Sequence, residues 1–416
     1  MSDIDVIIVG GGLAGISCAV TLHKKGVWPL VLEASDDIGG RVRTDFVEGY
    51  LLDRGAQVLL TAYPEAQRML DYSALDLRYY EPGALVRFGG SFHHVVDPWR
   101  RPLKIEKSIA TPIGTFSDKL KTAFLRRRTL KGDLSDIYSR PETSTFGYLV
   151  KAGLSDSMID RFFRPFLGSI FFDTRLDVSS RVFEFGFRMF SEGESALPAK
   201  GIGEIPKQLA SRIPEECIRT DAHVASLNEK TVILESGESL TAKRLVIATG
   251  GHEAARLLGQ KTTPEARGMV CMQFAAEASP LPEPLLVLNG DNRGPVCSLS
   301  VPSLLTSKIV PAGRELITVT VLGDPEEDDE ELKQAVREQL VDWFGPIIRE
   351  WQHLRTLRIP HALPLQIPPV EDPVRAPVRI SRNLFICGEH RSTASFQWAM
   401  VSGRRAAEAV VRSFQE

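Results

Sequence analysis

The stretch of sequence that decides the fold is residues 4–33, IDVIIVGGGLAGISCAVTLHKKGVWPLVLE. Ile4–Val9 is rich in β-branched residues and predicts a buried parallel strand. Three glycines follow at once, and apolar residues then recur at helical spacing as far as Gly26. A second apolar run, residues 29–32, ends on Glu33. This order of strand, glycine turn, helix, strand and acid predicts a βαβ unit rather than an isolated glycine turn.

Each part of this unit has a physical role in binding a dinucleotide. Gly10 permits a tight turn, Gly12 lets the backbone approach a pyrophosphate, and Gly15 lets the helix pack closely on the strand. The pyrophosphate would sit at the helix N-terminus, where unpaired N–H groups and the helix dipole favour negative charge. Glu33 is placed to accept hydrogen bonds from an adenosine ribose, and its carboxylate would repel the 2′-phosphate of NADP. The expected contacts are Gly10, Gly12, Leu13, Ala14, Gly15, Glu33 and Ala34.

Composition and charge are those of an ordinary globular protein with two or three domains. The chain has 416 residues, 43% of them apolar and 25% charged, and a formal net charge of −3. This balance lacks the basic footprint of a protein that binds nucleic acid. The five cysteines form no CxxC pair, which indicates a reducing compartment and no metal site. The chain start lacks a signal-peptide pattern and no apolar run is long enough to span a bilayer. We therefore expect a cytoplasmic protein that contacts a membrane at most peripherally.

A second glycine motif narrows the choice of dinucleotide. Gly39-Gly40-Arg41 follows Glu33 closely and is not needed to hold NAD. It resembles the GGR extension of the flavin-containing amine oxidase superfamily, whose members bind FAD in an extended form. Residues 50–57, YLLDRGAQ, are similar to the family's segment beside the isoalloxazine ring. The resemblance implies FAD contacts from Gly40, Arg41, Gly55, Ala56 and Gln57.

Two later segments extend this resemblance along the chain. Residues 198–210 resemble the family's P-x-G-G-M helix start, with Lys200 in place of the first glycine. Val224, which we expect at the end of a strand, matches the position that holds the adenine through its own backbone groups. Residues 383–389 resemble a strand ending in Gly-Glu, which implies that Glu389, after the Gly388 turn, bonds to the ribityl chain.

The last matching segment is a helix start at residues 395–407. In the family, backbone N–H groups corresponding to Ala399 and Met400 face the N1/C2=O edge of the flavin, where negative charge collects on reduction. Trp398 stands where the family usually has glycine, so its large ring must either sit near the flavin or point away from it. No Ser-Gly-Gly-Cys occurs near residues 383–400, which implies that the FAD is bound non-covalently.

These segments predict an α/β fold with a discontinuous layout. A Rossmann-like FAD-binding domain would comprise residues 1–80, 195–262 and 375–416. A discontinuous α+β substrate-binding domain would comprise residues 81–194 and 263–374.

Two features of the expected substrate domain bear on its ligands. Residues 162–190 contain nine phenylalanines, which we expect to form a packed core, with a minority lining a pocket for a large apolar substrate. Residues 104–131 are basic, and Phe116, Leu120 and Phe124 recur every four positions. Such an amphipathic helix either lies on an anionic membrane or turns its apolar stripe toward its own core.

The resemblance implies a reaction class but no catalytic side chain. Residues 161–168 and 359–364 resemble stretches of the protoporphyrinogen-oxidase and carotenoid-desaturase-like branch. This implies an FAD-dependent dehydrogenase, desaturase or oxidase that passes a hydride from a bulky apolar substrate to flavin N5. The acceptor of the electrons (oxygen, quinone or protein) is left open. One alternative is an amine oxidase acting on a primary or secondary amine, although the predicted strand Gly268–Phe274 lacks the family's usual lysine. The other is a non-catalytic flavin-binding redox sensor or subunit, with Trp398 covering the flavin.

Overall fold

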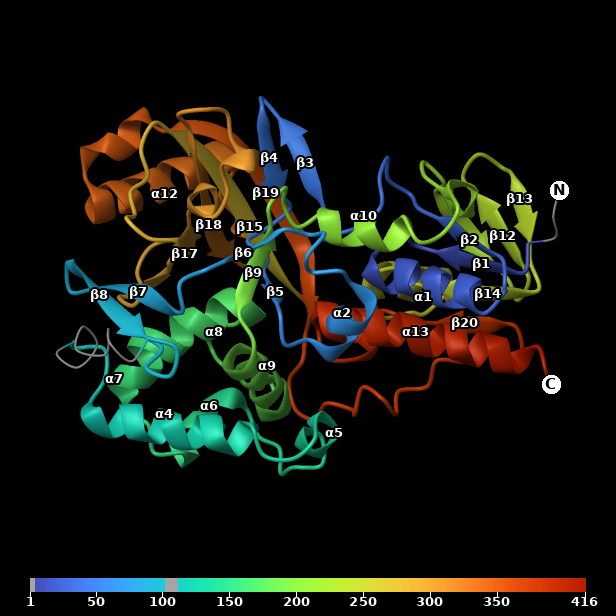
Figure 1. Cartoon of the computed structure of the whole chain (residues 1–416), viewed down its shortest axis with the longest axis horizontal. Helices are drawn as coiled ribbons and strands as arrows, with labels where there is room; N and C mark the ends of the chain where they lie inside the picture. Colours follow the sequence, from blue (N-terminus) through green and yellow to red (C-terminus); the bar gives the residue numbers. More distant parts are fainter. Residues whose placement is uncertain (1–3, 102–110) are drawn as a thin grey trace.

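A five-stranded parallel sheet organises one end of the molecule, at the right of Figure 1. The computed structural model describes residues 4–101 and 111–416. In spatial order the strands are β10 (Ile218–Arg219), β2 (Pro29–Leu32), β1 (Val6–Val9), β14 (Arg244–Ile247) and β20 (Leu384–Ile386). The first strand therefore begins at Val6, two residues later than the sequence predicts. All five strands come from the three segments assigned above to the FAD-binding domain.

The parallel sheet is covered on both faces, as its uninterrupted apolar strands require. Along β1, Val6 and Ile8 pack against helices α1 (Leu13–Lys24) and α13 (Phe396–Ser413). Ile7 and Val9 point the other way, toward a three-stranded sheet. That sheet consists of β11 (Val224–Leu227), β12 (Thr231–Leu234) and β13 (Ser239–Thr241). Val224 thus begins its strand instead of ending one, which corrects the prediction.

The second large sheet has seven strands and is mostly antiparallel. In order they are β19 (Gln352–Pro364), β15 (Ala266–Ala276), β18 (Glu315–Leu322), β17 (Val296–Ser300), β16 (Leu286–Asn289), β7 (Gly83–Phe88) and β8 (Ser91–Val96). Helix α12 (Asp329–Phe344) buries Leu332, Val336 and Leu340 against this sheet. The sheet strands fall within residues 81–194 and 263–374. The domain boundaries themselves stay a prediction.

A group of helices lies on the opposite side of this sheet from α12, in the lower left of Figure 1. Their core contains Phe163 and Phe183, both completely buried. The helices are α4 (Phe116–Thr129), α5 (Leu134–Ile137), α6 (Thr145–Lys151), α7 (Asp156–Met158), α8 (Arg164–Phe171) and α9 (Ser180–Glu192). Among the described residues, no helix has the length and apolar character that a bilayer crossing requires.

Short elements connect the two large sheets. The hairpin of β3 (Thr44–Val47) and β4 (Tyr50–Asp53) reaches from the parallel sheet toward β15 and β19. A small sheet joins β5 (Leu59–Leu60), β9 (Ser195–Pro198) and β6 (Leu77–Tyr79). The remaining helices are α2 (Pro64–Met69), α10 (Glu204–Ala210) and α11 (Gly251–Leu257).

Close packing at the first turn depends on glycine. A Cβ on Gly15 would lie 1.9 Å from the carbonyl oxygen of Gly10, and a Cβ on Gly403 of α13 would lie 2.0 Å from that of Ala14. Both contacts involve backbone atoms that cannot rotate away. Helices α1 and α13 therefore approach their neighbours at a distance that only glycine allows.

We expect Gly15→Ala to lower the thermal unfolding midpoint strongly, because overpacking a rigid site costs about 1–3 kcal/mol. Gly12→Ala is the matched control on the same turn, since its added carbon meets no atom within 4 Å and its φ is −73°. Both would be measured by calorimetry after removal of bound nucleotide. Equal midpoints for the two variants would contradict the packing role of Gly15.

Candidate functional site

A cavity of about 800 Å³ runs along the carboxyl edge of the parallel sheet and reaches the second sheet. This is the edge at which ligands bind in doubly wound α/β folds. The predicted residues on its wall are Gly10, Gly12, Leu13, Ala14, Glu33, Ala34, Gly40, Arg41, Gly55, Ala56, Gln57, Val224, Gly388, Glu389 and Ala399. Gly15, Trp398 and Met400 do not line it. Three widely separated segments of the chain therefore meet around one cavity.

The glycine turn leaves room for a phosphate at the start of α1. Gly12 is the N-terminal cap residue, its backbone is extended, and no side chain bonds to the amides of the first turn. No protein atom lies within 4 Å of the Cβ that Gly12 lacks, although Gly12 lines the cavity. The packing of the chain therefore does not require glycine here, whereas the approach of a pyrophosphate does.

Glu33 is held in place by neighbouring backbone and side-chain donors on the cavity wall. Its carboxylate accepts hydrogen bonds from the Gly11 amide at 2.7 Å and from the Ser35 amide and hydroxyl at 3.0 and 2.6 Å. Val224 lies on the same cavity wall, and its carbonyl accepts a hydrogen bond from Arg256 at 2.7 Å. One lone pair of that carbonyl is thus already used, which limits what the Val224 backbone can offer to an adenine.

Arg41 connects the nucleotide side of the cavity to the second sheet. Its guanidinium forms an ion pair with Glu389 and donates to the carbonyl of Ala362 on β19 at 2.5 Å. All three residues line the cavity. Arg41 and Glu389, which are both predicted to contact the cofactor, are therefore in contact with each other on the cavity wall.

The start of α13 differs from the prediction in detail. Trp398 N–H donates to the Ser395 hydroxyl at 3.2 Å, and Ala399 N–H donates to the Ser395 carbonyl at 3.0 Å. Within the described structure, the amides left without a partner at this helix start are those of Phe396 and Gln397. The prediction of donors at Ala399 and Met400 is corrected by about one helical turn, because the helix begins at Phe396.

Trp398 points away from the cavity into the core. Its ring centroid lies 5.9 Å from that of Tyr138 and 5.7 Å from that of Phe185, and the residue is 5% exposed. The indole thus neither blocks nor covers the cofactor cavity. Met400 is completely buried in the same core.

The wall also contains residues beyond the predicted contacts, of which sequence reasoning missed Thr249 and Thr393. Thr249, Gly250, His390 and Thr393 line the cavity. Within residues 4–101 and 111–416, neither ring nitrogen of His390 nor the hydroxyl of Thr249 has a hydrogen-bond partner, although all are buried. Burial, together with Arg391 and Arg41, lowers the pKa of His390 to about 4, so its ring is neutral at pH 7. Buried polar atoms without partners fit a polar ligand in this cavity. The Thr-Gly-Gly turn after a buried strand was the signal for Thr249 and Gly250.

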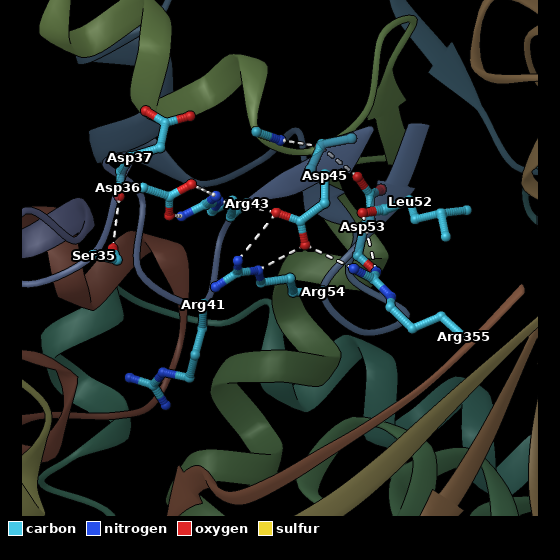
Figure 2. Close-up of polar contacts among 12 residues, drawn as sticks. Ser35, Asp36, Asp37, Arg41, Arg43, Asp45, Leu52, Asp53, Arg54 and Arg355 are labelled. Carbon is cyan, nitrogen blue, oxygen red and sulfur yellow. Dashed lines mark hydrogen bonds and ion pairs between the residues drawn. The ribbon is translucent and has the colours of Figure 1, made fainter. Parts of the chain in front are cut away.

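An ionic cluster ties the β3–β4 hairpin to β19 (Figure 2). The Asp45 carboxylate receives hydrogen bonds from Arg54 at 2.8 and 3.1 Å and from Arg355 of β19 at 2.7 Å. Arg43 approaches the same carboxylate to 3.0 Å and also binds Asp36. Burial alone would raise the pKa of Asp45, but the hydrogen bonds from Arg54 and Arg355 outweigh it and lower the pKa.

Arg355 also fixes the backbone segment that leads into the cavity wall. Arg355 donates to the Asp53 carbonyl at 3.0 Å and to Gln273 of β15 at 2.8 Å. Two residues past Gly55, Gln57 donates its amide to the carbonyls of Arg41 and Arg54 at 2.6 and 2.9 Å. Residues 53–57 are thereby tied to the second sheet and to the Arg41 backbone, which positions residues 54–57 on the cavity wall.

Asp53 has the opposite electrostatic environment from Asp45. Its carboxylate accepts hydrogen bonds from Thr44 at 2.5 Å and from the Ile202 amide at 3.0 Å. It faces a small internal cavity of about 20 Å³, which accounts for its residual accessibility. Burial is the dominant influence and raises the pKa of Asp53 to about 6.

We expect Asp53→Asn to change the pH dependence of stability. A folded pKa of about 6 against an ordinary value of 3.8 means that the charged carboxylate destabilises the fold above pH 6. This destabilisation of the wild-type protein disappears as the pH falls from above 6 toward 3.8, because the carboxylate becomes protonated. The unfolding midpoint of the variant minus that of wild type should therefore decrease from pH 7 to pH 4 in calorimetry. A constant difference across that range would show that Asp53 titrates normally.

A second cavity of about 330 Å³ adjoins the first and lies among β7, β8 and helices α4, α8 and α9. The two share the wall residues Ala56, Val58, Ser169, Ile170 and Phe190. Of the nine phenylalanines of residues 162–190, only Phe163 and Phe183 line neither cavity. Four of the nine, Phe162, Phe166, Phe187 and Phe190, line this second cavity, which agrees with the expectation that a minority would line an apolar pocket. Helices α8 and α9 contribute aromatic side chains to both cavities, while Phe183 of α9 is buried in the helical core.

No metal chemistry is indicated by the described part of the chain. His, Cys and carboxylate side chains do not gather there into a group of three or more that could hold an ion. The five cysteines are all buried, and burial raises the pKa of Cys271 to about 12. Cys271 is accordingly a core residue and not a thiolate nucleophile at neutral pH.

A glycine turn at a helix start, an acid after the second strand and an adjoining apolar cavity are the arrangement of a nucleotide-dependent oxidoreductase fold. The family described as flavin-containing amine oxidoreductase matches residues 13–411. The chain belongs to this family, and a flavin is its cofactor, which confirms the family and the α/β fold class predicted from the sequence.

Curated relatives with named activities match parts of the chain. Polyamine oxidase 2 of Arabidopsis thaliana is 50% identical over 54 residues, which are 13% of this chain and 11% of that protein. Coproporphyrinogen III oxidase of Propionibacterium freudenreichii is 23% identical over 175 residues, 40% of this chain and 31% of that protein. The 15-cis-phytoene desaturase of Solanum lycopersicum is 24% identical over 263 residues, 59% of this chain and 44% of that protein. The matches span less than half of each relative.

Solved structures share the fold over nearly the whole chain. An oxidoreductase from Methanosarcina mazei has a TM-score of 0.75 at 16% identity, covering 97% of this chain and 100% of that one. Cyclohexylamine oxidase from Brevibacterium oxydans has a TM-score of 0.75 at 16% identity and covers 100% of both chains. At these identities the likeness establishes the fold alone.

Proposed function

We propose that the protein is an FAD-dependent oxidoreductase that binds FAD non-covalently and oxidises a bulky, mainly apolar substrate. The cofactor part is supported by Gly12 and Glu33, which both line the first cavity and occupy the positions that the motif assigns to a pyrophosphate and an adenosine ribose. The dehydrogenase, desaturase or oxidase character follows the family. The electron acceptor (oxygen, a quinone or a protein) stays open.

The single observation that carries the substrate class is the apolar cavity next to the cofactor cavity. Its wall includes Phe162, Phe166, Phe187 and Phe190, and it shares Ala56 and neighbouring residues with the cofactor cavity. An apolar ligand gains about 25 cal/mol for each Å² that it buries, so such a wall favours a large hydrocarbon surface. The relatives named phytoene desaturase and coproporphyrinogen III oxidase are consistent with substrates of this size.

A bound flavin accepts a hydride and supplies the redox chemistry. The chain's own residues bind, orient and exclude water. Residues 54–57 line the first cavity, and Ala56 among them also lines the apolar cavity; Arg355 holds the carbonyl of Asp53 that precedes them. The unsatisfied amides at the start of α13, with the positive end of the helix dipole, favour negative charge at the adjoining cavity wall. No side chain of this chain is assigned the role of a base.

Oxidation of an amine is the second candidate, and Polyamine oxidase 2 is the observation that favours it. Strand β15 carries Met269 on the cavity wall and contains no lysine. A small cationic amine would be held by an aromatic cage or a carboxylate, and the apolar cavity favours a different ligand. The non-catalytic alternative is weakened, since Trp398 does not cover the cofactor cavity.

We expect the purified protein to be yellow and to release FAD intact on acid or heat denaturation. Gly12→Val should abolish FAD binding by filling the space kept for the pyrophosphate, while far-ultraviolet circular dichroism stays unchanged. Chromatography of the released flavin and absorbance at the flavin band check both statements. Release of FMN, or flavin that stays attached to the denatured chain, would contradict non-covalent FAD binding.

We expect bulky apolar compounds, such as polyenes or porphyrinogens, to bleach the flavin in anaerobic stopped-flow experiments. Ser169 lies on the wall of both cavities. A tryptophan side chain there would fill space where the two cavities adjoin, so Ser169→Trp should slow this bleaching by about tenfold or more. The control is Ser135→Trp, the same change at an exposed position of α5.

Flavin content and unfolding midpoint would be compared for the two tryptophan variants. This comparison distinguishes obstruction between the two cavities from a damaged fold. Rapid bleaching by simple mono- or polyamines, with none by the bulky compounds, would replace this proposal with amine oxidation.

A further inference from the structure

Helix α4 carries an apolar stripe that faces solvent. Phe116, Leu120 and Phe124 are 68%, 50% and 70% exposed. Residues four apart on a helix are turned by only about 40° from each other, so the three side chains form one continuous stripe. The face that packs on the protein is a different one, with Asp118, Leu125 and Thr129 buried. The alternative in which this stripe covers the protein's own core is therefore wrong.

Basic side chains surround the stripe. Arg127 lies within it and is exposed, and by helical geometry Lys119 and Arg126 lie on one side and Lys121 and Arg128 on the other. The acid of this helix, Asp118, is buried and held by Thr115 and Ser155. It contributes nothing to the exposed face. Lys104, Glu106 and Lys107, part of the basic segment noted in the sequence, lie outside the described residues.

The stripe also borders the apolar cavity. Lys119, Thr122 and Arg126 of α4 line that cavity on one side of the stripe. Trp99 lines it as well, is 44% exposed, and lies under the Arg126 guanidinium at 4.8 Å. Figure 1 shows α4 along the lower edge of the molecule, away from both large sheets. An apolar compound held at this edge would be next to the cavity wall.

We propose that α4 docks the protein on an anionic lipid surface, with Phe116, Leu120 and Phe124 inserted among the acyl chains. Lysines and arginines beside an apolar stripe keep their charges at the headgroups while their stems cover apolar surface. A second copy of this chain is a poorer occupant, because two such faces would bring like charges together. Docking is independent of the reaction proposed above, since it is measured on the resting holoenzyme.

The test is co-flotation of the holoenzyme with vesicles of phosphatidylcholine, with and without phosphatidylglycerol. We expect binding to the anionic vesicles that weakens as salt is raised. The triple variant Phe116→Ser, Leu120→Ser, Phe124→Ser should bind them about tenfold or more weakly, and Arg127→Glu should lose affinity for the anionic vesicles selectively. The control is Phe46→Ser, which removes a 74% exposed phenylalanine from β3 and should bind as wild type does.

Flavin absorbance and the unfolding midpoint verify that each variant is folded, because all four substituted positions of α4 are exposed. Absence of wild-type binding to anionic vesicles would overturn the proposal. Equal binding of the triple variant and wild type would also overturn it. The stripe would instead be an interface between copies if wild type does not bind vesicles and forms a dimer without lipid in sedimentation velocity, and if the triple variant is a monomer. In every case the stopped-flow result with soluble substrate decides the reaction separately.

Discussion

The Asp45 carboxylate, bound by Arg54 and Arg355, is the contact on which the geometry of the site depends. Arg355 belongs to β19 of the second sheet, whereas Asp45 lies on β3 of the hairpin and Arg54 directly follows β4. Charge-assisted hydrogen bonds of this kind are strong and directional. The guanidinium also holds the Asp53 carbonyl, so the loop that leads into the first cavity wall is fixed at one end by the second sheet. Loss of Arg355 would leave Asp45 with fewer cations in a partly buried place, which is costly.

The two cavities have complementary chemistry because different parts of the chain build them. Glycine turns, helix starts and Glu33 give the first cavity donors and acceptors suited to a dinucleotide. Helices α8 and α9 give the second an aromatic wall, and they contribute aromatic side chains to the first as well. Since Phe190 and Ser169 contribute to both walls, a ligand in the apolar cavity would lie beside the cofactor.

Asp45 and Asp53 illustrate how position decides charge in this cluster. Both are acids of one short hairpin, yet the pKa of Asp45 is lowered by its arginines and that of Asp53 is raised by burial to about 6. His390, near the Glu389 end of the same cavity, is kept neutral by burial and by neighbouring arginines. None of these differences can be seen in the spacing of the residues along the chain.

The sequence by itself determined the βαβ unit, the turn glycines and the family. These features depend on contacts between near neighbours, so strand, turn and helix leave a readable order of residues. It also located most of the cofactor cavity, because each wall segment carries its own local motif. Tertiary structure alone decided that Arg355 would meet Asp45, which lies 310 residues away along the chain. It also decided that Trp398 would point into the core and that the stripe of α4 would face solvent. Helical periodicity shows that one face is apolar, but which neighbour covers that face depends on the packing of distant elements.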